Sequence, residues 1–352
     1  MSSITRRSLL RIGSMATAAA VLPTVSAHAE EPAKNRVCQI LGIQKPVVQA
    51  IMFDMTNADL VAAVSEAGGL GVLSMTTIDQ VAEVQALTSK PFAVSSFLTD
   101  EDTAAALKDA GVKIICAGTV QFPTHDYGFE IEGLSAGPDS IAFWKDHGFT
   151  VLCKQLNATL EGALAIQDAG ADILIPVGFG AGGCAPYNTT AAPQLISEFK
   201  AGGVEIPMLA AGGIVNYDTA AACAAVGAEG AYCGTRFLAT DESNCCDAAK
   251  KIIVQTRSED LVTMPTSLKG EVYSLVPCIK NDLSEKAIDM WRSGATYDEI
   301  TQFNGTNAQF WASMSAGNID EWGVGMDRAV NLITSIRPAA DIVNEIAGAF
   351  GC

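Results

Sequence analysis

The chain has 352 residues, of which 49% are apolar and 17% are charged, so it can bury a large core and is not a disordered polypeptide. Acidic residues outnumber basic ones by 39 to 22, and this excess argues against nucleic acid as a partner. The length suits one large domain with an appendage.

Residues 1–29 have the composition of an export signal. The adjacent arginines Arg6-Arg7 precede a mildly apolar run, Ile12–Val25, and Ala27-His28-Ala29 then supplies small residues for a signal peptidase. A twin-arginine-type signal peptide is therefore expected, and with it a periplasmic or extracytoplasmic location. A disordered basic tail is the alternative. An integral membrane protein is not expected, because the apolar run falls short of ~20 residues.

From residue 46 onward, short apolar or β-branched runs alternate with amphipathic segments, which is the sign of βα units and a parallel sheet. Eight strands are expected: Pro46–Ile51, Leu70–Ser74, Phe92–Phe97, Val112–Ala117, Thr150–Lys154, Ile173–Val177, Ile206–Ala211 and Gly230–Cys233. The helical segments between them end in small residues and glycine, which stop a helix and start the next strand. No GxGxxG follows the first strand, so a closed eight-stranded β/α barrel is favoured over a doubly wound sheet.

The alternation stops after about Thr256. Thr263–Cys278 has no clear period, whereas Leu283–Arg292, Tyr297–Phe303 and Ala339–Phe350 look helical. The barrel is therefore expected over residues 38–257, and a helical appendage that covers its mouth over residues 258–352.

Two expected strands end on glycine. The seventh is followed by Gly212-Gly213 and the eighth by Gly234-Thr235. Glycine lets backbone N–H groups close on a phosphate, and in β/α barrels a ligand phosphate sits on the loops after strands seven and eight. Tight turns without a ligand are the alternative.

The segment PMLAAGGI at Pro207–Ile214, followed by GAEGAYCGTRFLAT at Gly227–Thr240, resembles the nitronate monooxygenases (2-nitropropane dioxygenases) and the related FMN-dependent enoyl-ACP reductases. Two further segments agree with that family, PVVQAIM at Pro46–Met52 and GADILIPVGFGAGGC at Gly170–Cys184. The resemblance spans roughly Cys38 to Thr256, and it implies a TIM (β/α)8 barrel that binds FMN.

The resemblance also implies which residues contact the flavin. The expected FMN-binding residues are Ala50, Met52, Ser95, Gly182, Gly183, Gly212, Gly213, Gly234 and Thr235. The last four match family positions that hold the phosphate, and Ala50 and Met52 match positions beside the ring. Ser95 stands where the family often has asparagine, so its hydrogen bonding to the flavin is expected to be weaker.

Several positions depart from the family pattern. The family has a glutamate-alanine-glycine-glycine-histidine run where this chain has Gly180 to Cys184, so both acid–base side chains are missing. Monooxygenase members also carry a catalytic histidine just after strand four, and Cys116–Thr119 contains none. Ile51 replaces the usual proline between Ala50 and Met52.

Three side chains are candidates for catalysis. His125 lies in a long loop after the fourth strand, Gly118–Gly137, and could act as a base or donor over the flavin, or be a plain surface histidine. Cys184, in the loop after strand six, is an acid, a redox partner or a small apolar filler. Lys154, at the end of strand five, would place a cation in the barrel mouth or would have no role. His147, at a helix end, is expected to be structural.

The ten cysteines show no CxxC spacing, so no metal or iron–sulfur site is predicted. Most lie in apolar segments and are expected to be small core residues. Export would permit disulfides, with Cys245, Cys246, Cys278 and Cys352 as the favoured ends and no pairing deducible.

We therefore expect an exported FMN-dependent oxidoreductase that resembles nitronate monooxygenase and acts on a small organic substrate. Because NAD(P)H is a cytoplasmic reductant, the substrate itself or a redox partner would have to supply electrons. One alternative is a flavin-dependent reductase of an unsaturated or carbonyl compound, fed by a non-NAD(P)H donor. The other is a flavin-binding or ligand-binding protein without turnover.

Overall fold

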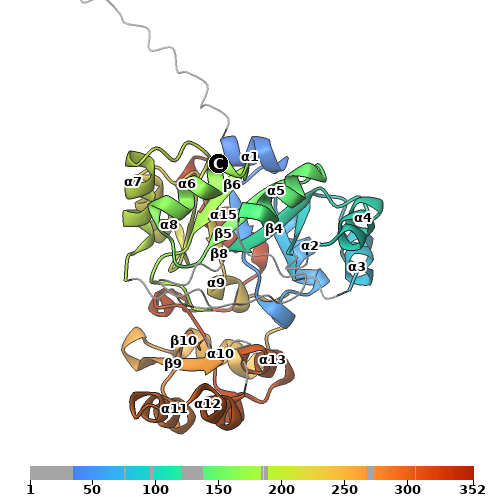
Figure 1. Cartoon of the computed structure of the whole chain (residues 1–352). Helices are drawn as coiled ribbons and strands as arrows, with labels where there is room; N and C mark the ends of the chain where they lie inside the picture. Colours follow the sequence, from blue (N-terminus) through green and yellow to red (C-terminus); the bar gives the residue numbers. More distant parts are fainter. Residues whose placement is uncertain are drawn as a thin grey trace, which may run out of the picture. The chain divides into compact units, whose positions relative to one another are not determined.

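Eight short parallel strands form a closed ring at the centre of the fold in this computed structural model (Figure 1). They are β1 (Val47–Gln49), β2 (Gly71–Ser74), β3 (Phe92–Ser95), β4 (Ile114–Thr119), β5 (Thr150–Gln155), β6 (Ile173–Pro176), β7 (Leu209–Ala211) and β8 (Gly230–Cys233). The strands pair in the orders β2-β3-β4-β5-β6 and β1-β8-β7. Parallel bridges from Val48 to Leu70 and from Leu174 to Met208 join the two sets. The predicted closed barrel is thus confirmed.

The structure describes residues 35–74, 77–95, 99–119, 138–183, 185, 189–267, 273–305 and 307–352. The expected signal peptide (1–29), His125 and Cys184 lie outside these ranges. From Lys34 to Cys352 the chain is one compact unit, and the boundary expected at residue 257 stays a prediction.

Alternation along the strands divides the buried side chains into two sets. Val48, Cys116 and Tyr232 belong to a cluster inside the ring, whereas Ala231 and Cys233 belong to the layer between the strands and the helices. Neighbouring residues of β8 therefore point to opposite faces, as the period of a strand requires. β7 begins at Leu209, later than expected from the sequence, because Pro207 cannot donate to a strand ladder.

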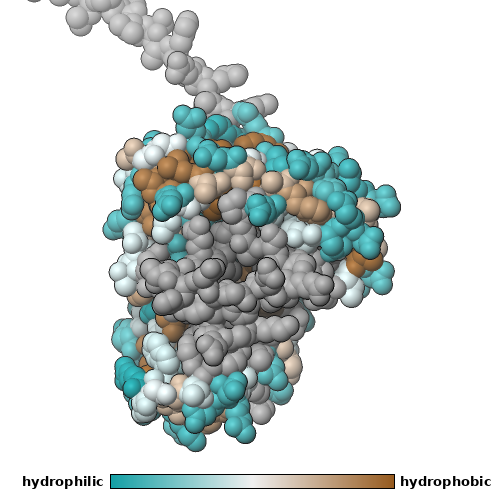
Figure 2. Space-filling view, viewed as in Figure 1, coloured by the Kyte–Doolittle hydropathy of each residue, from teal (hydrophilic) through white to brown (hydrophobic). Residues whose placement is uncertain are grey.

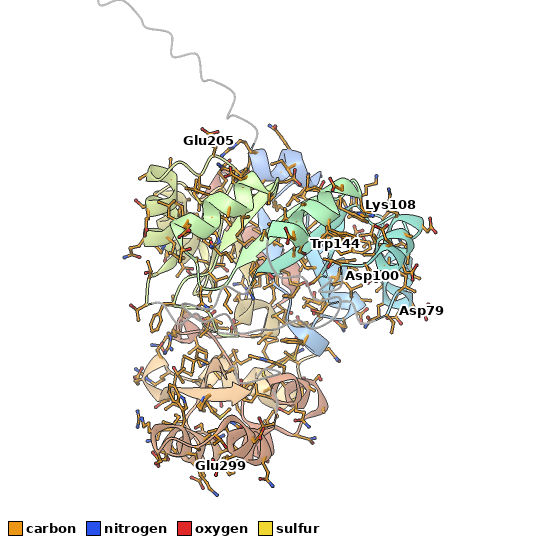
Figure 3. All side chains as sticks on the ribbon, in the orientation of Figure 1. Asp79, Asp100, Lys108, Trp144, Glu205 and Glu299 are labelled. Atoms are coloured by element: carbon orange, nitrogen blue, oxygen red, sulfur yellow. The ribbon has the colours of Figure 1, made fainter. Side chains whose placement is uncertain are left out.

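Amphipathic helices alternate with the strands and form the outer layer. They are α2 (Ala58–Glu66), α3 (Asp79–Leu87), α4 (Glu101–Asp109), α5 (Pro138–Asp146), α6 (Leu160–Asp168), α7 (Ala192–Ala201) and α8 (Tyr217–Ala224). In α4, only Ala104 and Leu107 are buried, and Figure 2 shows hydrophilic side chains over this helix. Figure 3 shows Lys108 at the edge of the molecule and Trp144 of α5 within its outline, and Trp144 is fully buried.

Short elements flank the barrel, and several helices follow it. They are α1 (Arg36–Leu41), η1 (Phe53–Met55), α9 (Thr235–Leu238), α10 (Asp247–Gln255), η2 (Ser258–Asp260), α11 (Asp282–Arg292), α12 (Tyr297–Asn304), α13 (Asn307–Ala316), α14 (Ile319–Trp322), η3 (Val330–Leu332), α15 (Ala339–Ala347) and η4 (Gly348–Phe350). The three helices expected after residue 258 are α11, α12 and α15 with η4. Within the described part of the chain, no helix combines the length and apolar character that a bilayer-spanning segment requires.

The C-terminal region also contains an antiparallel pair of strands, β9 (Leu261–Ser267) and β10 (Tyr273–Ile279), which the sequence analysis left unassigned. Figure 1 shows this pair gathered with α11, α12 and α13. Pro265 and Pro277 lie inside the two strands, and each removes a backbone donor that a strand normally uses. β10 is also bridged to segments outside the pair, at Leu275 by Ala185 and at Cys278 by Gly325.

Three contacts bring the C-terminal region onto the loops at the carboxyl ends of the barrel strands. The backbone N–H of Ala185, after β6, donates to the carbonyl of Leu275 at 2.8 Å. The N–H of Arg328 donates to the carbonyl of Gly180 at 3.1 Å, and α13 packs against η1. The end of the barrel where β/α enzymes carry their active sites is therefore covered from one side.

Candidate active site

A cavity of about 250 Å³ lies at the carboxyl ends of the barrel strands. Its walls come from the segments after β1, β6, β7 and β8, from β5, and from α13 and the segment after α14. The lining residues are Ala50, Ile51, Met52, Phe53, Lys154, Leu156, Val177, Ala181, Gly182, Gly183, Ala211, Gly212, Gly213, Ile214, Tyr232, Cys233, Gly234, Thr235, Leu238, Trp311 and Asp327.

Most of the site residues expected from the sequence meet at this cavity. Those that line it are Ala50, Met52, Lys154, Gly182, Gly183, Gly212, Gly213, Gly234 and Thr235. Ser95 does not line it; the side chain is buried, and its hydroxyl has no partner among the described residues. His125 and Cys184 lie outside the described residues, so their roles stay predictions.

The turn after β7 requires glycine twice. Gly212 and Gly213 have φ angles of 95° and 80°, a backbone region that side chains disfavour. A Cβ on Gly212 would lie 2.5 Å from the carbonyl oxygen of Gly178, so the turn packs directly against the loop after β6. Among the described residues, none accepts a hydrogen bond from the amide of Gly212 or Gly213. Both amides are therefore available to a ligand.

The turn after β8 lies across the cavity from the first strand. Gly234 precedes α9, and a Cβ there would lie 3.7 Å from Cβ of Ala50 and 3.9 Å from Sδ of Met52. The amide of Gly234 has no acceptor among the described residues. The hydroxyl of Thr235, by contrast, is engaged by the protein, because it accepts a hydrogen bond from the backbone N–H of Asp327 at 2.9 Å.

Gly182 and Gly183 differ in what surrounds them. A Cβ on Gly182 would lie 2.2 Å from the backbone nitrogen of Asp327, so glycine there permits two chain segments to touch. A Cβ on Gly183 would meet no described atom within 4 Å. The lack of a side chain at Gly182 thus allows the segment at Asp327 to pack against the loop after β6. At Gly183 the lack of a side chain leaves open space beside the cavity.

Asp327 is a site residue that the sequence analysis missed. It is 4% exposed, and its Oδ1 accepts a hydrogen bond from the backbone N–H of Ala329 at 2.8 Å. Burial raises the pKa of this carboxyl from 3.8 to about 7, against the opposing effect of hydrogen bonds from Ala329 and Thr235. A carboxyl group that titrates near neutrality thus stands beside Thr235.

Tyr232 is a second residue that was missed. Its hydroxyl accepts a hydrogen bond from the backbone N–H of Ile51 at 3.0 Å and lies 3.9 Å from Sγ of Cys116. Burial raises the pKa of Tyr232 well above its usual value. Burial also raises the pKa of Cys116 to about 11, while the charge of Lys154 acts in the opposite direction. The cavity wall therefore carries a neutral phenol and a lysine, and a neutral thiol lies beside the phenol.

The rest of the cavity wall is largely apolar. Ile51, Leu156, Val177, Ile214, Leu238 and Trp311 supply aliphatic and aromatic surface. The indole nitrogen of Trp311 is buried and has no partner among the described residues. A planar, apolar ring with a few polar edges suits such walls.

His147 lies away from the cavity and has structural partners. Its Nδ1 is 2.7 Å from the carbonyl oxygen of Phe143, and its Nε2 is 2.9 Å from Oε2 of Glu101. The contact with the Phe143 carbonyl is the larger cause that raises the pKa of His147, and Glu101 adds to it. The ring ties the end of α5 to α4, as expected for a structural histidine.

The cysteines of the described residues are free thiols, so no disulfide occurs among them. Where the structure describes the chain, no three His, Cys, Asp or Glu side chains gather as a metal site would require.

Comparison with known proteins agrees with this geometry. A family model described as nitronate monooxygenase matches residues 34–348. A Mycobacterium tuberculosis protein named (3aS,4S,5R,7aS)-5-hydroxy-7a-methyl-1-oxo-octahydro-1H-indene-4-carboxyl-CoA dehydrogenase is 30% identical over 293 residues, covering 80% of this chain and 77% of its own length. A probable nitronate monooxygenase of Staphylococcus aureus is 28% identical over 276 residues, covering 65% of this chain and 74% of its own length.

Solved structures share the fold over nearly the whole chain. FabK from Thermotoga maritima has a TM-score of 0.75 at 24% identity and covers 91% of this chain and 96% of its own. The nitroalkane oxidase from Streptomyces ansochromogenes has a TM-score of 0.67 at 22% identity, with coverage of 90% and 98%. Together with the barrel and the cavity at its carboxyl end, the match over residues 34–348 shows that this oxidoreductase chain belongs to the nitronate monooxygenase family.

Proposed function

We propose that this protein is an exported, FMN-dependent oxidoreductase that acts on a small organic substrate. The observation that supports it most directly is the pair of turns after β7 and β8. The amides of Gly212, Gly213 and Gly234 border one cavity and have no acceptor among the described residues. Backbone N–H groups in such turns bind phosphate without a side chain.

The cavity fits FMN at both ends, with one exception. At Gly213 and Gly234 an added Cβ would lie 3.7 Å from the nearest described atom, so both turns are open there, and the apolar wall with Trp311 suits the flavin ring. The exception is the carboxyl of Asp327, which lines the cavity and forms a hydrogen bond with the side chain of Thr235, at the end where the phosphate is expected. When bound, FMN would supply two-electron redox chemistry at its ring.

The residues of this chain would orient the reactants and control protons. Lys154 brings a cation to the cavity from β5, which favours a substrate with negative charge. Tyr232 keeps its proton at ordinary pH, because burial raises the pKa of its hydroxyl, and it is therefore a candidate donor. His125 and Cys184 remain candidates from the sequence alone.

Nitronate oxidation by O₂ is the leading reaction, because the family and its Staphylococcus aureus relative carry that name. It needs no NAD(P)H, which suits an exported enzyme. The alternative is reduction of an unsaturated or carbonyl compound with electrons from a redox partner. The replacement of the family's acid–base pair by Gly180 and Cys184 favours that alternative. A 30% identical relative is named a dehydrogenase of a CoA ester, which carries out hydrogen transfer in the opposite direction.

Export is supported by the sequence of residues 1–29, with Arg6-Arg7 before an apolar run. Twin-arginine systems carry folded proteins, so the flavin would be bound before export. Replacing Arg6-Arg7 with lysines should keep the protein in the cytoplasm; secretion at the wild-type level would refute this route.

The proposed activity is tested on the purified protein under anaerobic conditions. For nitronate oxidation, in which the nitronate is the electron donor, a nitronate is added to the oxidised flavin and the loss of flavin absorbance is followed. For the reductase, the bound flavin is first reduced chemically, and enones or quinones are then added one at a time as oxidants. Reduction of the flavin by a nitronate supports the first reaction, and reoxidation of the reduced flavin by an enone or a quinone supports the second. A flavin that none of these compounds reduces or reoxidises would favour a binding protein without turnover.

A further inference from the structure

The strongest unexplained feature of the cavity is a carboxyl group at its phosphate end. Asp327 is 4% exposed and lines the cavity together with Thr235. Its backbone N–H holds the Thr235 hydroxyl at 2.9 Å, and its Oδ1 is held by the Ala329 N–H at 2.8 Å. The backbone of Asp327 also touches Gly182, where a Cβ would lie 2.2 Å from its nitrogen. The backbone of Asp327 is therefore fixed between two of the turns expected to hold phosphate, and its carboxyl is held there by hydrogen bonds with Ala329 and Thr235.

A fixed carboxylate in that place opposes a phosphate dianion. Like charges that share a buried site raise each other's pKa, and the least costly solution is a shared proton. A protonated carboxyl donates a hydrogen bond to a phosphate oxygen, whereas an ionised one only repels it. The protonation state of Asp327 thus decides whether its side chain attracts or repels a phosphate bound at the turns after β7 and β8.

The described charged groups around Asp327 do not neutralise it. No described cation forms an ion pair with it. Arg328, the next residue, is turned away, with its guanidinium 4.3 Å from the ring centre of Phe179 and 2.7 Å from Oγ1 of Thr263. Cys233 on β8 faces the carboxyl, and burial keeps it a thiol by raising its pKa.

The remaining titratable groups of the cavity lie on other strands. Lys154 comes from β5, and Tyr232 from β8 is a neutral phenol. Trp311 of α13 brings no charge. The carboxyl of Asp327 is therefore the acidic side chain that the described part of the chain brings to this cavity.

We propose that Asp327 binds the phosphate of the mononucleotide in its protonated form, so that ligand binding takes up a proton at this carboxyl. The inference rests on the proposed FMN function and adds a specificity-determining residue to it. Burial supports it, because it places the pKa of Asp327 at about 7 in the free protein. Below that pH the side chain is a donor, and above it the side chain is an anion.

The proposal predicts how affinity changes with pH. Above about pH 7, the dissociation constant of FMN should rise about tenfold per pH unit, because one proton must be taken up for each ligand bound. Asp327→Asn keeps the shape and cannot ionise, so its dissociation constant should stay level over the same range. Riboflavin has the same ring and no phosphate, so its binding to the wild type should not follow this pH dependence.

The experiment is a fluorescence titration of the full chain with FMN and with riboflavin, from about pH 6 to about pH 9, the range that brackets the carboxyl's titration. The wild type and Asp327→Asn are compared, and thermal unfolding confirms that both are folded. A ratio of wild-type to variant dissociation constants that grows with pH for FMN supports the proposal. In the wild type, FMN should lose affinity more steeply with pH than riboflavin, and Asp327→Asn should remove this difference.

Other outcomes overturn the proposal in distinguishable ways. If wild type and variant bind FMN with parallel pH profiles, Asp327 takes up no proton and only this inference fails. The same holds if FMN and riboflavin weaken equally with pH in the wild type. If neither protein binds FMN at any pH, the proposed function fails and this inference fails with it.

Discussion

At the scale of single residues, the turn after β7 makes the strictest demand on the sequence. Gly212 combines a φ of 95° with a backbone contact that would leave a Cβ only 2.5 Å from the Gly178 carbonyl oxygen. Either feature alone disfavours a side chain, and together they exclude one without movement of the loop after β6. The absence of a Cβ at Gly212 is therefore required both for the turn expected to bind phosphate and for the packing of that turn against the loop after β6.

We predict that Gly212→Ala lowers the free energy of unfolding by about 1–3 kcal/mol, because it adds backbone strain and a backbone clash. Gly183→Ala is the matched stability control, since its Cβ would meet no described atom within 4 Å. Its effect should stay within about 0.5 kcal/mol. Denaturant unfolding measures both, and equal losses in the two variants would contradict the described packing.

Tyr232 anchors the backbone of the first loop. Tyr232→Phe removes the acceptor of the Ile51 N–H, which is held at 3.0 Å. We expect faster hydrogen exchange at the segment containing Ile51, and a loss of about 1–3 kcal/mol if the amide stays buried. Cys116→Ala keeps that hydrogen bond and serves as the control. Unchanged exchange at Ile51 in Tyr232→Phe would show that the hydroxyl does not hold this loop.

Asp327 should also make stability depend on pH. Its pKa is about 7 in the folded chain and 3.8 for a free aspartate side chain, the value expected in the unfolded chain. Between these two pH values the folded state therefore binds more protons than the unfolded state. The free energy of unfolding of the wild type should therefore fall as pH rises from about 4 to about 7, by at most roughly 4 kcal/mol relative to Asp327→Asn. Thermal unfolding across that range measures it, and parallel curves for the two proteins would contradict an Asp327 buried as described.

The two missed residues differ in how far sequence could reveal them. Tyr232 lies in an expected strand, and alternation along β8 places it inside the ring, so its position was predictable. Asp327 lies 92 positions after Thr235 in a stretch without periodicity, and only the folded chain brings the two together. Long-range contacts of irregular segments leave no local signal.

At the scale of elements, the strands and helices of the barrel were predictable because the residues within each element and at its ends specify its type and its limits. Apolar strand runs and glycine stops recur along the chain, and the structure places all eight strands within the expected segments or beside them. β9 and β10 were not predictable in this way. Pro265 and Pro277 interrupt their donor pattern, and among the described residues the two strands pair with each other over their full length and with the barrel only through the bridge from Leu275 to Ala185.

Helix α4 offers a test of local capping. The side chain of Asp100 accepts a hydrogen bond from the Thr103 N–H at 2.8 Å at the start of the helix, and this bond is the largest cause that lowers the pKa of Asp100. Asp100→Ala should cost about 1 kcal/mol of unfolding free energy near neutral pH, and the loss should shrink as acid protonates the wild-type carboxyl. Asp109→Ala, at the other end of α4, is the control. Equal effects of the two variants would argue against a cap.

At the scale of the whole chain, the C-terminal region completes the cavity that the barrel begins. Asp327 and Trp311 line it from beyond the last barrel strand, and Ala185 and Gly180 connect the loop after β6 to the same region. The barrel therefore provides the glycine turns after β7 and β8. The C-terminal region provides the aromatic wall at Trp311 and the carboxyl group of Asp327. The resemblance to the nitronate monooxygenase family predicted the first part, whereas Asp327 emerged only from the structure.

The most direct test of the central claim is the flavin content of the purified full chain, measured by absorbance before and after addition of FMN at about pH 6, below the pKa of Asp327. We expect a yellow protein that holds one FMN per chain. A colourless protein that retains no added FMN would contradict it.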